Sequence, residues 1–169
     1  METTAKLYSL SYRDTKTYLF AVLFIAGNIL LPQLCHLVSG GGLVWLPIYF
    51  FTLIASYKYG LRVGMLTAVL SPLVNSLLFG MPPVSVLPVI LIKSTLLSFA
   101  GAYAAQRTGK ISIVAIVAAV LFYQIVGTAF EWAIAGSFFT AVQDFRTGIP
   151  GMLTQVFGGY LLLKAIAKV

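Results

Sequence analysis

The sequence predicts an all-α integral membrane protein, a bundle of six transmembrane helices with both termini in the cytoplasm. Of its 169 residues, 60% are hydrophobic and only 9% are charged, whereas a soluble domain usually has about 45–50% apolar and about 25% charged residues. Long apolar stretches recur along the chain, and a membrane helix needs about 20 such residues. Basic residues are concentrated in alternate connections, as in multi-pass membrane proteins.

The length of the chain limits its domain organisation. Six helices of about 20 residues would occupy about 120 residues, which leaves no room for a fused soluble ATPase or DNA-binding domain. We therefore expect a cytoplasmic tail over residues 1–16 and one transmembrane domain over residues 17–169. A net charge of +7 would suggest nucleic acid binding in a soluble protein. Here the basic residues orient helices, so we expect the lipid bilayer, and no nucleic acid, around the protein.

Turn signals divide the chain into its expected spans. In chain order these spans are residues 17–38, 43–57, 63–79, 84–105, 111–135 and 148–167. The connections between them are the Gly-rich loop 39–42, the basic turn 58–62, the Gly-Met-Pro-Pro turn 80–83, the basic turn 106–110 and the longer loop 136–147. The second and third spans are shorter than a full crossing, so we expect them to be tilted or to lie where the bilayer is thin. We also expect Pro72 to break the third span.

The basic residues predict the orientation of the bundle. Nine of the eleven Lys and Arg residues fall in the N-terminal tail, the second and fourth connections and the C-terminal end: Lys6, Arg13, Lys16, Lys58, Arg62, Arg107, Lys110, Lys164 and Lys168. The opposite side has only Arg146, and Lys93 lies within a span. Because short loops rich in Lys and Arg stay in the cytoplasm, both termini are expected there.

Polar residues within the expected spans lie mostly in the outer half of the membrane. They are Asn28, Gln33, His36, Tyr49, Asn75, Lys93, Gln124, Glu131 and Gln155, of which only Asn28 and Gln124 approach the midplane. Polar groups at this depth are costly unless they face a cavity or one another. One interpretation is an outward-facing cavity that binds a small polar molecule. The alternative is a set of interhelical hydrogen bonds that stabilise the bundle.

The cavity interpretation selects nine candidate ligand-binding residues: Gln33, His36, Trp45, Tyr49, Asn75, Lys93, Glu131, Trp132 and Gln155. Lys93 and Glu131 are ionisable and lie at similar depth, so either they pair with each other or one of them binds an ionic group of the ligand. Trp45 and Trp132 either anchor the protein at the membrane interface or stack on a flat ligand ring.

The chain contains no motif for common enzymatic chemistry. It lacks a Gly-x-x-x-x-Gly-Lys-Ser/Thr phosphate loop, a His-Glu-x-x-His zinc motif and a Gly-x-Ser-x-Gly elbow. We therefore expect no enzymatic activity, and in particular no ATP hydrolysis, from this chain alone. His36 is its only histidine, so we expect no metal site and no cofactor. The single cysteine, Cys35, excludes an internal disulfide and is expected to be a buried thiol.

Several segments resemble the substrate-binding membrane subunits, or S components, of energy-coupling-factor (ECF) transporters, which are ABC-type vitamin transporters. The resemblance rests on residues 31–37 (Leu-Pro-Gln-Leu-Cys-His-Leu), 40–42 (Gly-Gly-Gly), 46–49 (Leu-Pro-Ile-Tyr), 64–73, 80–83 (Gly-Met-Pro-Pro) and 87–88 (Leu-Pro). It covers residues 31–93 well and the remainder only by length and number of expected helices.

The resemblance implies a role in micronutrient uptake. Such subunits bind a vitamin or related compound in an outward cavity of the prokaryotic plasma membrane. They then associate with a transmembrane coupling protein and two cytoplasmic ATPases. Many members have His and Glu where this chain has Tyr49 and Lys93; a lysine favours a ligand with an anionic group, unless Lys93 pairs with Glu131. A solitary transporter or channel, and a membrane enzyme or assembly factor without a ligand, are the alternative functions.

Overall fold

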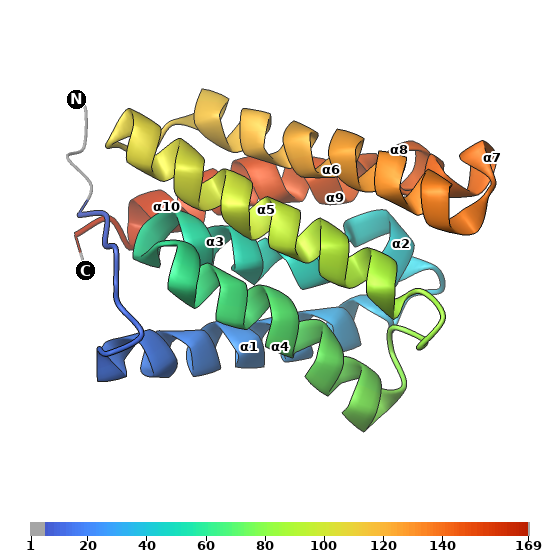
Figure 1. Ribbon diagram of the computed structural model, residues 1–169, viewed down its shortest axis with the longest axis horizontal. Helices are drawn as coiled ribbons and strands as arrows, with labels where there is room; N and C mark the ends of the chain where they lie inside the picture. The colour runs from blue at the N-terminus through green and yellow to red at the C-terminus, as the bar shows by residue number, and fades with distance from the viewer. Residues whose placement is uncertain (1–5, 169) are drawn as a thin grey trace.

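The computed structural model describes residues 6–168 and shows an all-helical bundle without strands in that range (Figure 1). Residues 1–5 of the expected N-terminal tail lie outside the described residues. The elements are α1 (Thr15–Cys35), α2 (Gly41–Trp45), η1 (Pro47–Tyr49), α3 (Phe50–Tyr59), α4 (Leu61–Phe79), α5 (Leu87–Thr108), α6 (Ile113–Ala135), α7 (Phe138–Ala141), α8 (Gln143–Thr147), α9 (Ile149–Leu153), η2 (Thr154–Gly158) and α10 (Gly159–Ala165).

Four of the described helices, α1, α4, α5 and α6, are long and apolar enough to cross a membrane. This finding confirms the predicted helical class and indicates a multi-pass membrane protein. The elements α9, η2 and α10 follow one another without a gap, so they form one helical run of 17 residues with a π-helical turn in its middle. The short helices α7 and α8 occupy a segment that the sequence predicted to be a loop.

The expected second span is not a single helix, which corrects the sequence prediction. Leu46 has the left-handed conformation, with φ of 46°, and separates α2 from η1 and α3. Pro47 explains the position of the break, because a residue that precedes proline is disfavoured in the right-handed helical conformation. Proline itself is well suited to the first position of the new helix.

The expected break at Pro72 is also wrong, because α4 continues through this residue. Proline removes one backbone donor from a helix interior. The neighbouring hydroxyls of Thr67 and Ser71 donate to the carbonyls of Val63 and Thr67, at 2.9 and 2.6 Å. These two bonds do not reach the carbonyl of Ala68, the group whose backbone partner Pro72 removes. The helix nevertheless continues, as membrane helices commonly do at proline.

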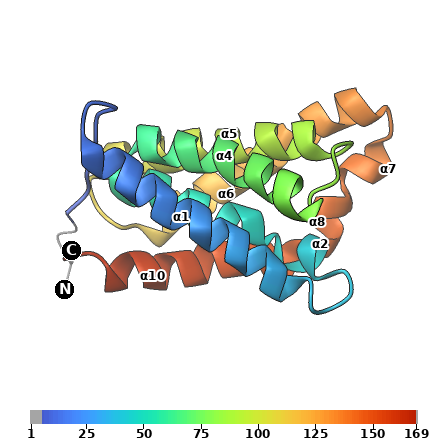
Figure 2. The same cartoon turned by 90° about the horizontal axis from the view of Figure 1, so that it is seen from below.

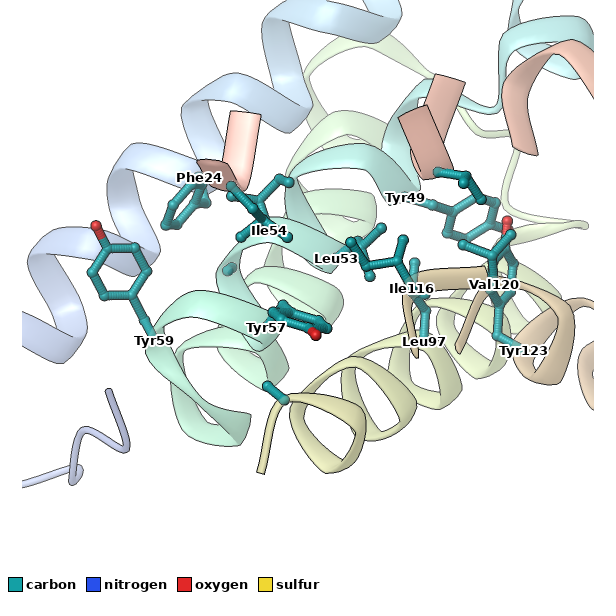
Figure 3. Packing of buried hydrophobic residues seen from close by; sticks show 14 of the residues in the cluster. Phe24, Tyr49, Leu53, Ile54, Tyr57, Tyr59, Leu97, Ile116, Val120 and Tyr123 are labelled. Carbon is teal, nitrogen blue, oxygen red and sulfur yellow. The ribbon is translucent and has the colours of Figure 1, made fainter. Parts of the chain in front are cut away.

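Helix α3 lies at the centre of the bundle. All of its residues from Thr52 to Tyr59 are buried, and α1, α4 and α5 pack around it. Figure 3 shows Leu53 and Ile54 of this helix among residues of the surrounding helices. Helix α3 is only ten residues long, but it contributes much of the core because neighbouring helices cover it on all sides.

One end of the bundle contains both ends of the described chain (Figures 1 and 2). The backbone N–H of Lys6 donates to the carbonyl of Ala167 at 3.1 Å. The buried ammonium group of Lys58 donates to the carbonyls of both residues, at 2.7 and 3.1 Å. We call this the basic end. The order of the helices brings the N-terminal tail, the second and fourth connections and the C-terminus to it, and these segments contain nine basic residues. The opposite end, with α2, α7 and the connection between α4 and α5, is the distal end.

Candidate functional site

The polar residues toward the distal end, most of them buried or half-buried, form two groups. The first, which we call the lysine cluster, consists of Tyr49, Lys93, Ser94, Tyr123, Gln124, Thr128, Glu131 and Gln155, from η1, α5, α6 and η2. The second, which we call the Asn75 cleft, is lined by His36 and Asn75, at the ends of α1 and α4, and Gln33 contacts Asn75 beside it. Seven of the nine residues selected from the sequence are thus divided between two places in the fold.

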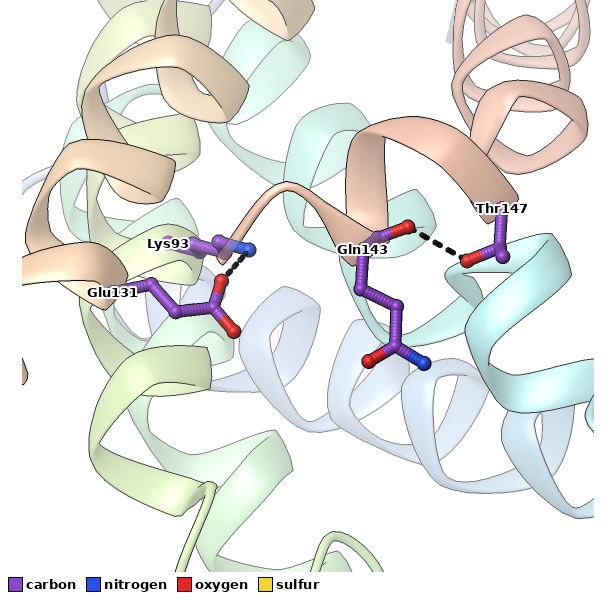
Figure 4. Close-up of polar contacts among 4 residues, drawn as sticks. All are labelled: Lys93, Glu131, Gln143 and Thr147. Carbon is purple, nitrogen blue, oxygen red and sulfur yellow. Dashed lines mark hydrogen bonds and ion pairs between the residues drawn. The ribbon is translucent and has the colours of Figure 1, made fainter. Parts of the chain in front are cut away.

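Lys93 and Glu131 form an ion pair at the core of the lysine cluster (Figure 4), with 2.6 Å between Nζ and Oε2. The lysine side chain is fully buried and that of Glu131 is 17% exposed. Gly127, one turn before Glu131 on α6, makes room for the lysine, because a Cβ atom there would lie 2.5 Å from its Cγ. The pair satisfies two charges that would each be expensive alone in the membrane.

Two tyrosines and a glutamine extend the cluster towards η2. The rings of Tyr49 and Tyr123 pack with 5.1 Å between their centroids, as Figure 3 shows. The hydroxyl of Tyr123 donates to Oε1 of Gln155 at 3.0 Å. Gln155 lies within the π-helical turn, and such turns occur frequently at functional sites. Tyr123 and Gly127 lie four residues apart, on the same face of α6, so the tyrosines adjoin the ion pair.

Several buried polar atoms of the lysine cluster have no hydrogen-bond partner among the described residues. They are Nε2 and Oε1 of Gln124, Nε2 of Gln155, Oγ of Ser94 and Oγ1 of Thr128. Each such group costs about 1–3 kcal/mol when it is removed from water without a partner. Their concentration beside an ion pair means that a polar molecule entering here would find donors and acceptors already in place.

The Asn75 cleft is a pocket of about 330 Å³ between α1, α2, α4 and the connection to α5. Its lining is largely apolar and includes Pro32, Pro82, His36 and Asn75. Nδ1 of His36 lies 2.6 Å from the carbonyl oxygen of Pro32. A volume of this size, with a few polar groups in apolar walls, matches the range of about 300–1,000 Å³ that is usual for small-molecule pockets.

Hydrogen bonds within the bundle engage the amides of Gln33 and Asn75. Gln33 donates to Oδ1 of Asn75 at 3.3 Å, and Asn75 donates to the carbonyl of Asn28 at 2.9 Å. These contacts join α1 to α4, which is the stabilising role considered as the alternative to ligand binding. Asn75 still borders the cleft, so it is placed both to hold the helices and to meet a ligand.

The two tryptophans lie on the surface. Trp45 is 45% and Trp132 is 52% exposed, and Trp132 packs edge-on against Phe138 with centroids 5.5 Å apart. Exposed indole rings near the ends of membrane helices are typical of interfacial anchors. Among the side chains that the structure describes, no group of three His, Cys, Asp or Glu residues is arranged to hold a metal ion.

Sequence reasoning missed Tyr123, Ser94 and Thr128 as members of the lysine cluster. It placed Gln124 near the midplane but did not select it as a site residue. The available signal was the spacing along α6 of Tyr123, Gln124, Gly127, Thr128 and Glu131, since residues three and four apart share a helix face.

Comparison with known proteins adds no relative: no family model, no curated protein and no solved structure matches this chain.

Proposed function

We propose that this protein is the substrate-binding S component of an ECF-type ABC transporter in the plasma membrane of a prokaryote. In this role it captures a vitamin or related micronutrient from outside. Delivery to the cytoplasm then requires a transmembrane coupling protein and two cytoplasmic ATPases. The observation that carries the proposal is the set of unpartnered buried polar atoms beside the Lys93–Glu131 pair. The sequence resemblance over residues 31–93 supports the family.

We further propose that the bundle crosses the membrane six times. The four long helices supply four crossings, and the broken segment from α2 to α3 and the run from α9 to α10 supply the other two. An even number of crossings fits the contact between Lys6 and Ala167, which brings both ends of the described chain to the basic end. The concentration of Lys and Arg at that end favours a cytoplasmic location for it, and the lysine cluster and the Asn75 cleft would then lie toward the outer side.

Single cysteines in a Cys35→Ser background are expected to report this topology. Ser39→Cys and Thr140→Cys at the distal end should react with a membrane-impermeant maleimide in intact cells. Gln106→Cys at the basic end should react only after permeabilisation; all three wild-type side chains are exposed. Gly41 is avoided, because a Cβ atom there would meet the carbonyl oxygen of Cys35. Labelling of position 106 in intact cells would contradict the orientation.

The purified chain is expected to bind its ligand and to show no ATPase activity, because its sequence lacks a phosphate-binding loop. Uphill uptake should appear only when coupling and ATPase subunits are present in the same proteoliposomes. Native mass spectrometry of the purified protein measures the mass of any copurified ligand. Accumulation against a gradient by the isolated chain, without ATP or an ion gradient, would instead support a solitary transporter.

A further inference from the structure

A groove of about 500 Å³ runs between α5 and α6 near the basic end. Its floor is made of small side chains, including Ala104, Ala115 and Ala119, and its walls include Tyr103 and Phe122. The two aromatic side chains are 59% and 46% exposed. The groove is therefore open along the surface of the bundle, and it is separate from the lysine cluster and the Asn75 cleft.

The position of this groove exposes it to the hydrocarbon of the bilayer. Both helices that form it are long and apolar enough to cross a membrane. From Phe99 to Arg107, its lining residues at the two ends on α5, the groove extends about 12 Å along the helix axis. This length is close to half of the hydrocarbon core, which is about 30 Å thick. The groove thus matches the depth of one leaflet, the one that borders the basic end.

Charge is present at only one end of the groove. Arg107 lies there, is exposed, and makes no hydrogen bond or ion pair with the part of the chain that the structure describes. No Asp or Glu occurs in the sequence between Lys93 and Glu131, so neither helix supplies a counterion near it. Lys110 follows three residues later and adds a second positive charge to this connection.

We infer that the groove binds one anionic phospholipid, with an acyl chain between α5 and α6 and the phosphate beside Arg107. Such a lipid has a narrow apolar chain and a negative group at one end, which complements the apolar groove and its single charged end. Basic pockets between membrane helices on the cytoplasmic side are known to take anionic head groups. An apolar helix of a partner protein, about 10 Å wide, would instead cover the groove without neutralising the charge of Arg107. The inference requires a bilayer around the protein and does not depend on the proposed transport function.

Lipid binding by the full chain tests this inference. Detergent-purified protein is titrated with phosphatidylglycerol or with phosphatidylcholine of the same acyl chains, and bound lipid is counted by native mass spectrometry. Wild type should retain one phosphatidylglycerol more tightly than phosphatidylcholine. Arg107→Gln should weaken the phosphatidylglycerol complex about fivefold, the effect of one basic residue near an anionic surface, and should leave phosphatidylcholine unchanged. Arg62→Gln, a basic-end control outside the groove, should change neither.

The groove itself is tested by a matched pair of apolar substitutions. Ala118→Leu fills the groove and should reduce binding of both lipids, whereas Ala129→Leu, also on the exposed side of α6 but outside the groove, should not. Two outcomes would overturn the inference. One is equal affinity for the two lipids in wild type. The other is efficient crosslinking between two chains through Ala118→Cys in the Cys35→Ser background, which would show that a second copy covers the groove.

Discussion

Lys93→Met is expected to lower the free energy of unfolding by about 3–5 kcal/mol, the usual cost of removing one partner of a buried ion pair. The substitution leaves the Glu131 carboxylate, only 17% exposed, without the ammonium group that now lies 2.6 Å away. Replacement of both partners, by Lys93→Met with Glu131→Leu, should restore most of the lost stability, because no uncompensated charge then remains. Unfolding in detergent micelles, followed by fluorescence or by thermal shift, measures each step.

The control for this series is Lys164→Met, which removes an exposed lysine at the basic end whose Nζ lies 4.8 Å from the Tyr160 ring centroid. Its effect should stay within about 1 kcal/mol. Additive losses in the two single variants of the buried pair would show that Lys93 and Glu131 do not interact, since coupled residues are non-additive. That result would contradict the ion pair itself.

The double variant also separates a structural role from a ligand-binding role. If Lys93 contacts an anionic ligand group, the stable double variant should lose at least about 1.5 kcal/mol of binding free energy, the lower range for a hydrogen bond to a charged group. We expect this loss, because the cluster around the pair contains unpartnered polar atoms that point to a ligand. Unchanged affinity in a stable double variant would remove both residues from the site.

The helices could be predicted from the sequence because the membrane constrains them strongly. Four of the six expected spans correspond to single long helices, and the ends of α4 and α6 coincide with their predicted ends at residues 79 and 135. The Leu46 break was missed because composition shows where apolar residues lie but not which backbone conformation each one has. The prediction at Pro72 was wrong because α4 continues through this residue: membrane helices commonly tolerate proline, which a rule based on one residue type does not include.

The candidate site could be predicted only in part. Lys93 and Glu131 stood out because ionisable residues are rare within membrane spans, and the structure pairs them. Tyr123, Ser94 and Thr128 did not stand out, because these residue types are common in membrane helices and only packing shows which side they face. The division between the lysine cluster and the Asn75 cleft depends on how α1, α4, α5 and α6 pack together, which residue type and depth alone do not determine.

Gln124→Leu and Asn28→Leu are expected to change stability in opposite directions, although both remove a fully buried amide. The Asn28 amide is satisfied: Nδ2 donates to Thr52 at 3.0 Å, and Oδ1 accepts from the backbone N–H of Phe51 at 3.1 Å. Its replacement strands these partners at about 1–3 kcal/mol for each group left unsatisfied. The Gln124 amide has no partner among the described residues, so leucine of similar size should raise the free energy of unfolding by about 1 kcal/mol or more.

The same substitution at Gln124 should weaken ligand binding at least about tenfold, which corresponds to 1.4 kcal/mol. A polar group that is kept buried without a partner destabilises the empty protein, and binding a ligand that pairs with it recovers this cost. Unfolding of the empty protein and titration with the copurified ligand measure the two effects separately on the same sample. If Gln124→Leu instead lowered the free energy of unfolding, as Asn28→Leu is expected to do, the Gln124 amide would already have a partner within the bundle. Increased stability with unchanged affinity would show that the ligand binds elsewhere, and the Asn75 cleft would then be the place to test, through His36→Leu.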